Sequence, residues 1–158
     1  MTIFLSKSKS GKLWLRDERI ASIVKDSIHY RDGKEYLLIA YCIMPNHVHL
    51  VFTLIVERFA ESLKGTEHNK MQQVGRNSVS PYIVTKILQD LKKYTARESN
   101  KILNRKGQFW QHESYDHVVR DEDDLRRIVE YVLNNPVKAG LINRSEDWKW
   151  SYVNTKLM

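Results

Sequence analysis

The order of hydrophobic patterns along the chain predicts an α+β fold, βαββαβα, in which helices pack against an antiparallel sheet. Residues 36–43 are apolar on both faces, as expected of a central strand that is covered on each side. A turn at 44–46 and a second strand at 47–53 complete a hairpin. Helical spacing of apolar residues marks three longer segments, at 14–29, 81–103 and 121–135. A chain of 158 residues is expected to form a single domain, 1–158.

The first half of the chain begins with a short strand at 2–5 and a helix at 14–29. The apolar positions of that helix follow helical spacing: Leu15, Ile20, Ile23, Val24 and Ile28. The hairpin then leads into residues 54–80, which are polar and contain two glycines. We expect this segment to be a mobile excursion from the domain.

The second half of the chain supplies two helices and one strand. Pro81 suits the first turn of a helix that runs to about residue 103, and a strand is expected at 112–120. Asp121 opens the last helix, whose acidic first turn matches the positive end of the helix dipole. Pro136 is expected to end or kink this helix, and the tail is expected to pack back over the sheet. The resulting order is close to the ferredoxin-like arrangement.

Composition narrows the classes of partner and compartment. Lys and Arg outnumber Asp and Glu by 26 to 19, and the net charge of +7 favours a polyanionic partner such as nucleic acid. The single cysteine, Cys42, lies in an apolar strand and is expected to be a buried thiol. No apolar run approaches the ~20 residues that span a bilayer, and the N-terminus lacks the pattern of a secretory signal. These features predict a cytoplasmic, nucleoid-associated protein.

Two histidines at alternate positions of the second hairpin strand are the first candidate functional residues. Side chains at i and i+2 of a strand point to the same face, so His47 and His49 are expected to project together. Neutral imidazole is a common ligand of divalent ions, and the pair therefore predicts half of a metal site. A pair of surface histidines on the polar face of a strand is the alternative interpretation.

A tyrosine and an asparagine on the last helix complete the predicted site. Tyr131 and Asn135 are four residues apart, which makes their side chains neighbours on one face of the helix. Tyr131 lies outside the core stripe, which suits a nucleophile, although a tyrosine whose hydroxyl reaches water would also lie there. A phenol is a poor nucleophile at neutral pH, and a divalent ion that polarises the phosphodiester and stabilises the departing oxygen can compensate. The carbonyl oxygen of Asn135 would be a third ligand, beside the histidines, for Mg²⁺ or Mn²⁺.

Several separated segments of the chain resemble the HUH single-tyrosine transposases, in the form of the REP-associated tyrosine transposases. The matching segments, in chain order, are 44–50, 93–97, 109–111, 115–121 and 131–141. The resemblance implies a ferredoxin-like core and metal-dependent cleavage and rejoining of single-stranded DNA near a hairpin, through a 5′-phosphotyrosine intermediate. It implies that Tyr131 is the nucleophile and that His47 and His49 are metal ligands. Asn135 stands where many relatives have glutamine.

Positively charged residues and further tyrosines extend the set of candidates. Lys93, Arg97 and Arg120 are candidates for contacts with DNA phosphates. Two rival tyrosines are assigned structural places, Tyr94 on the core stripe of its helix and Tyr115 on a strand. His117 is an alternative metal ligand, and His29, His68 and His112 have no partner that the sequence identifies.

Two other functions compete with a DNA-cleaving enzyme. A non-catalytic or domesticated module with this fold would bind single-stranded nucleic acid by base stacking and phosphate contacts. A metal-dependent hydrolase that uses the two histidines is less favoured, because no nearby carboxylate completes its site. Relatives include dimers and monomers, so the resemblance is compatible with either a homodimer or a monomer. The segment 54–80 is longer than the connection usual in the family.

Overall fold

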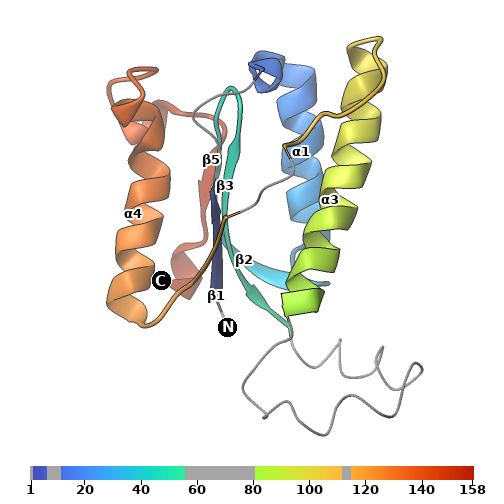
Figure 1. Cartoon of the computed structure of the whole chain (residues 1–158). Coiled ribbons are helices and arrows are strands. Elements are labelled where there is room, and N and C mark those ends of the chain that lie inside the picture. Colours follow the sequence, from blue (N-terminus) through green and yellow to red (C-terminus); the bar gives the residue numbers. More distant parts are fainter. Residues whose placement is uncertain (1, 7–11, 56–80, 112–114) are drawn as a thin grey trace, which may run out of the picture.

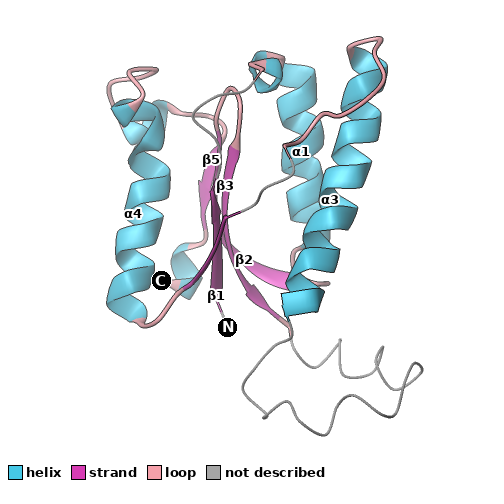
Figure 2. Ribbon diagram, viewed as in Figure 1, coloured by secondary structure: helices cyan, strands magenta, loops and turns pink. Residues whose placement is uncertain are grey.

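The computed structural model describes residues 2–6, 12–55, 81–111 and 115–158. The helices and strands follow the order β1 (Thr2–Ser6), η1 (Trp14–Arg16), α1 (Glu18–Arg31), β2 (Tyr36–Ile43), β3 (Val48–Leu54), α3 (Pro81–Ile102), β4 (Tyr115–Val118), α4 (Glu122–Lys138), η4 (Ser145–Asp147), β5 (Ser151–Val153) and η5 (Thr155–Leu157). The predicted α+β fold and its βαββαβα order are therefore confirmed, with one extra strand at the end (Figure 2). The excursion expected at 54–80 lies outside the described residues from position 56 onward.

The strands form one antiparallel sheet of five in the order β4-β1-β3-β2-β5. In Figure 1, α1 and α3 cover one face of this sheet and α4 covers the other. Alternation along β3 divides its side chains between the two faces. Leu50 and Phe52 join the larger core under α1 and α3, whereas Val51 joins the smaller core under α4. The sheet is thus covered on both sides, which explains the apolar character of β2.

Two ends of helices differ from the expected positions. The helix expected at 14–29 is divided: residues 14–16 form a 3₁₀ turn, and α1 begins after Asp17, whose side chain accepts from the Arg19 backbone N–H. Pro136 does not end α4, which continues to Lys138 because a proline near the last turn removes only one helical hydrogen bond.

Gly140 ends α4 instead. It has a φ of +68°, the Leu141 N–H donates to the Pro136 carbonyl at 3.0 Å, and the Gly140 N–H donates to the Val137 carbonyl at 2.9 Å. This is the Schellman pattern of a helix C-terminus, in which a left-handed residue follows the last turn.

The C-terminal tail packs against the sheet through Leu141 and Trp148 and then extends it by one strand. β5 pairs antiparallel with β2, with Ala40 opposite Val153. The indole of Trp148 donates to the Ile43 carbonyl at 3.0 Å, which anchors the approach to this edge strand. The expectation that the tail packs back on the sheet is met by these contacts, but the sequence did not predict the strand β5. A strand of three residues has too little pattern of its own to be recognised, and it forms because β2 offers a free edge. No helix among the described residues is long and apolar enough to cross a membrane.

Candidate active site

The β2–β3 hairpin positions both histidines. Its turn is closed by the Met44 N–H, which donates to the His47 carbonyl at 2.8 Å, and Pro45 accepts a hydrogen bond from the Leu15 N–H at 3.0 Å. His47 immediately precedes β3, and His49 lies within the strand, opposite Cys42. His49 is 1% exposed and its ring meets Tyr131 of α4, on the face of the sheet away from Leu50 and Phe52. His49 thus lies on the opposite face of β3 from Leu50 and Phe52, as the alternation of side chains along a strand requires.

The two imidazole rings face each other through their Nε2 atoms, which are 3.0 Å apart. The ring centroids are separated by 4.7 Å and the ring planes are nearly perpendicular, at 87°. Nδ1 of His47 lies 2.7 Å from the side-chain oxygen of Asn46. An amide oxygen can only accept, so Nδ1 of His47 carries the proton and the neutral ring presents a lone pair at Nε2.

Burial keeps both histidines neutral. It lowers the pKa of His47, and it lowers the pKa of His49 to about 3. Repulsion from His47 lowers the pKa of His49 further, while a hydrogen bond with the Asn135 side chain partly opposes the shift. The charged form is disfavoured because the surroundings cannot solvate it. Both rings are therefore in the neutral form that a metal ligand requires at neutral pH.

The arrangement of these nitrogen atoms fits a divalent ion. Two adjacent ligands of an octahedral ion, each about 2.1 Å from it at a right angle, are about 3.0 Å apart. The two Nε2 atoms meet this requirement, and Asn135 is within hydrogen-bonding reach of His49. Among the described residues, no group of three or more His, Cys, Asp or Glu side chains is placed to hold a metal. The donor set that fits is therefore two imidazoles and one amide oxygen, which leaves other positions for water or phosphate.

Tyr131 presents an accessible phenol beside the histidine pair. Its ring meets the His49 ring edge to face, with centroids 5.6 Å apart and an interplanar angle of 81°. The helix is fixed against the sheet by Val129 and Val132, which are buried, whereas Tyr131 is 42% exposed. The ammonium of Lys138, two turns further along α4, lies 4.9 Å from the centroid of the Tyr131 ring. The structure thus brings His47, His49, Tyr131 and Asn135 together, from two elements on facing surfaces.

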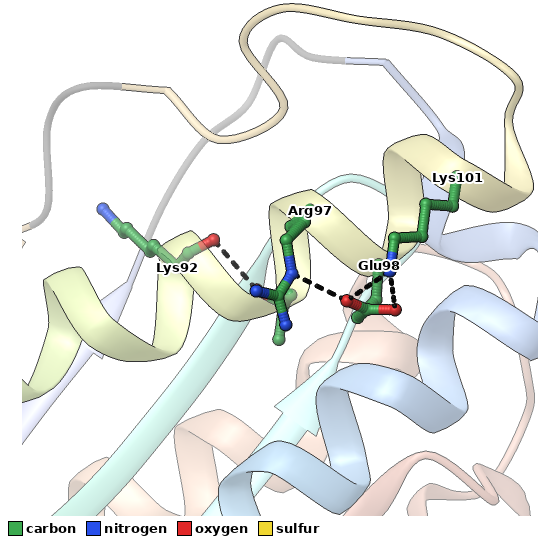
Figure 3. A network of polar contacts seen from close by, with 5 residues as sticks. Lys92, Arg97, Glu98 and Lys101 are labelled. Carbon is green, nitrogen blue, oxygen red and sulfur yellow. Dashed lines mark hydrogen bonds and ion pairs between the residues drawn. The ribbon is translucent and has the colours of Figure 1, made fainter.

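Two of the three basic candidates for DNA contact do not lie on the same face of the sheet as that cluster. Lys93 and Arg97 are on α3, across the sheet from α4, and Arg120 lies between β4 and α4. Arg97 is also engaged: Figure 3 shows Glu98 between Arg97 and Lys101, with nitrogen to oxygen distances of 2.8 and 3.0 Å. Much of its charge is therefore compensated within α3.

Tyr94 was assigned to the core stripe of α3, and this assignment was wrong. Tyr94 is 45% exposed, and the guanidinium carbon of Arg97 lies 5.6 Å from its ring centroid. Thr95 and Ser99 continue the buried stripe in its place, although both are polar. The Thr95 hydroxyl is accommodated because it donates to the Leu91 carbonyl at 2.8 Å.

The remaining candidate residues either contact partners that the sequence did not indicate or lie outside the residues that the structure describes. His29 contacts the Tyr41 hydroxyl at 3.2 Å and packs edge to face on Tyr152, so it has a structural place. Asn46 orients the His47 ring, a role that the sequence analysis missed. The only sign of this role in the sequence is that Asn46 directly precedes His47. Residues 68 and 112 are not described, nor are the side chains of Tyr115 and His117 in β4.

Comparisons with known proteins show which family this chain is similar to. No family model matches the chain. A putative REP-associated tyrosine transposase from Haemophilus influenzae is 27% identical over 114 residues, which cover 72% of this chain and 56% of that protein. The solved structure of a REP-associated tyrosine transposase bound to a REP hairpin superposes with a TM-score of 0.60, covering 95% of this chain and 74% of that one at 21% identity. The chain resembles REP-associated tyrosine transposases in sequence and in fold.

A second relative from Haemophilus influenzae, an uncharacterized protein, is 30% identical over 104 residues, which cover 61% of this chain and 52% of that protein. The chain thus spans about half the length of the curated relatives it matches. The family resemblance stated from the separated motifs is confirmed by the first relative and by the solved structure.

Proposed function

We propose that this protein is a REP-associated tyrosine transposase, which cleaves and rejoins single-stranded DNA at hairpins through a covalent bond to Tyr131. The observation that supports this proposal is the position of the accessible Tyr131 ring, 5.6 Å from the buried ring of His49. The Nε2 atom of His49 in turn lies 3.0 Å from the Nε2 atom of His47. A nucleophile and a ligand pair on two rigid elements are what phosphoryl transfer to a side chain needs.

The cleavage step exchanges one phosphodiester for another. The phenolic oxygen of Tyr131 attacks the phosphorus, its proton passes to solvent, and the bond from phosphorus to the 3′ oxygen breaks. The 3′ oxygen takes up a proton and leaves as a free hydroxyl, while the 5′ side of the DNA stays on Tyr131. Rejoining reverses these events with a 3′ hydroxyl as the nucleophile. The phosphotyrosine bond conserves the energy of the broken linkage, so no other energy source is required.

His47, His49 and Asn135 would hold a divalent ion, Mg²⁺ or Mn²⁺, and Asn46 would keep His47 in the ligating tautomer. When bound, the ion supplies polarisation of the phosphate and stabilises the charge on the leaving oxygen. The ammonium of Lys138, 4.9 Å from the centroid of the Tyr131 ring, adds a positive charge to the surroundings of the attacking residue.

Hairpin DNA is the substrate that these findings favour. The solved structure with the same fold holds a REP hairpin, and the net charge of +7 suits a polyanion. The decisive experiment incubates the full chain with a labelled pool of single-stranded hairpins and Mg²⁺ or Mn²⁺. Denaturing electrophoresis then compares wild type with Tyr131→Phe, which removes only the attacking oxygen.

A metal-dependent covalent adduct in wild type that is absent in Tyr131→Phe is the expected result. An adduct that persists in the variant would move the nucleophile to another residue. Equal hairpin binding by both proteins, with no adduct from any member of the pool, would instead identify a non-catalytic module that binds single-stranded nucleic acid.

A further inference from the structure

A groove of about 600 Å³ lies on the surface of α3, across the sheet from Tyr131. One wall is a strip of α3 and the other is the segment 107–111 that follows it. The lining positions on α3 run from Thr85 to Ala96, which on a helix is a length of about 16 Å. This groove is separate from the cluster of His47, His49 and Tyr131, because α3 and α4 cover opposite faces of the sheet.

The wall formed by 107–111 is held rigidly. The Trp110 indole donates to the Thr95 hydroxyl at 2.8 Å, and the Asn100 amide donates to the Gly107 carbonyl at 2.8 Å. Phe109 stacks on Trp14 with ring centroids 5.0 Å apart and meets Trp110 at the same distance. A wall that is already ordered costs little conformational entropy when a ligand binds.

The chemistry of the lining selects an anionic ligand with flat rings. Lys92 and Lys93 contribute positive charge, and no acidic side chain belongs to the described lining. Phe109 and Trp110, both partly exposed, contribute aromatic surface. Three glutamines add amide donors and acceptors: Gln89, Gln108 and Gln111. Positive charge that follows a phosphate backbone, together with aromatic rings on which bases stack, is the recurring composition of single-strand binding surfaces.

We infer that the groove between α3 and 107–111 binds a short single-stranded segment of DNA, next to the hairpin on which the enzyme acts. The inference rests on the proposed function for its substrate, but it concerns a second site. In this arrangement Lys92 and Lys93 contact phosphates, and the exposed parts of the Phe109 and Trp110 rings contact bases. The groove thus holds unpaired DNA while Tyr131 acts on the opposite face of the sheet.

The test measures the affinity of the full chain for fluorescein-labelled oligothymidylate of 15 nucleotides by anisotropy at several salt concentrations. Lys92→Gln with Lys93→Gln is the groove variant. Lys25→Gln, on α1, combined with Lys34→Gln, in the turn that follows α1, is the matched control with the same change in charge. We expect the groove variant to bind about tenfold more weakly and its salt slope to fall by about 1.4, since each single-strand phosphate contact contributes about 0.7. The control should stay within twofold of wild type.

Photocrosslinking locates the bases. Oligothymidylate in which one base is 5-iododeoxyuridine should attach to the tryptic peptide 107–120, which contains Phe109 and Trp110. Equal weakening by both lysine pairs, or a crosslink only outside 81–120, would overturn the inference.

The two proposals fail separately. A Tyr131 adduct with unchanged oligothymidylate affinity in the groove variant would refute the groove and keep the enzyme. Groove-dependent binding without any adduct would keep the groove and refute the enzyme.

Discussion

The Nε2 atoms of His47 and His49 lie 3.0 Å apart, on two rings that are nearly perpendicular. Without an ion, one of the two atoms must donate a hydrogen to the other. The Asn46 oxygen holds the proton of His47 on Nδ1, which makes His47 Nε2 the acceptor. If His47 and His49 both held a divalent ion through Nε2, the proton of His49 would have to move from Nε2 to Nδ1, because only an unprotonated ring nitrogen can ligate. In the proposed metal site, Asn46 would therefore orient His47 without itself being a ligand.

Asn46→Ala is expected to weaken the affinity for Mn²⁺ by about tenfold to a hundredfold, because loss of an outer hydrogen bond frees the ligand ring. The measurement is the Mn²⁺ concentration that gives half-maximal Tyr131 adduct on hairpin DNA. Asn46→Asp retains an acceptor oxygen and should stay closer to wild type. An unchanged Mn²⁺ requirement in Asn46→Ala would show that Asn46 does not orient His47.

Tyr94→Phe is expected to leave adduct formation unchanged, although Tyr94 is as exposed as Tyr131. Tyr94 lies on α3, on the other face of the sheet from His47 and His49, so its hydroxyl has no ligand pair beside it. Adduct yields of Tyr94→Phe and Tyr131→Phe, measured on the same hairpin pool, test this difference. Loss of the adduct in Tyr94→Phe would reassign the nucleophile.

Gly140→Ala is expected to lower the free energy of unfolding by about 1 kcal/mol, because an L residue is strained at positive φ. The φ of Gly140 is +68°, and an added Cβ would have no atom within 4 Å, so the cost comes from the backbone and not from a clash. Urea denaturation followed by tryptophan fluorescence gives the value. The comparison is Ala139→Gly, at the preceding position, where φ is −82° and the backbone is right-handed. Any loss of stability there comes from the added backbone freedom of glycine and not from strain.

Cys42 is expected to resist alkylation in the folded protein at pH 8. The side chain is fully buried, and burial raises the pKa of the thiol to about 11, so both access and thiolate are lacking. The thiol stays protonated below that pKa and ionises only as the pH rises through it. Iodoacetamide labelling followed by mass spectrometry should show modification in urea but not in buffer. Rapid labelling in buffer would place Cys42 at an accessible position.

Local periodicity accounts for the parts of the site that the sequence predicted. The period of a strand placed His47 and His49 on one face, and the period of a helix placed Tyr131 beside Asn135. The same reasoning failed for Tyr94, because the polar residues Thr95 and Ser99 occupy the buried stripe instead, and Thr95 satisfies its hydroxyl by donating to the Leu91 carbonyl. A pattern of hydrophobic residues does not reveal a polar residue that finds its partner inside the core.

The sequence by itself determined the order of elements, the split of side chains along β3 and the pairing of residues within α4. Only the tertiary structure decided which faces meet. α4 packs alone on one side of the sheet, so Tyr131 reaches His49, whereas Lys93 and Arg97 are carried on α3 to the other side. It also decided that the tail forms β5, since three residues become a strand only when β2 supplies the hydrogen bonds. Contacts between elements distant in the chain depend on packing and sheet edges, and these leave no periodic mark in the sequence.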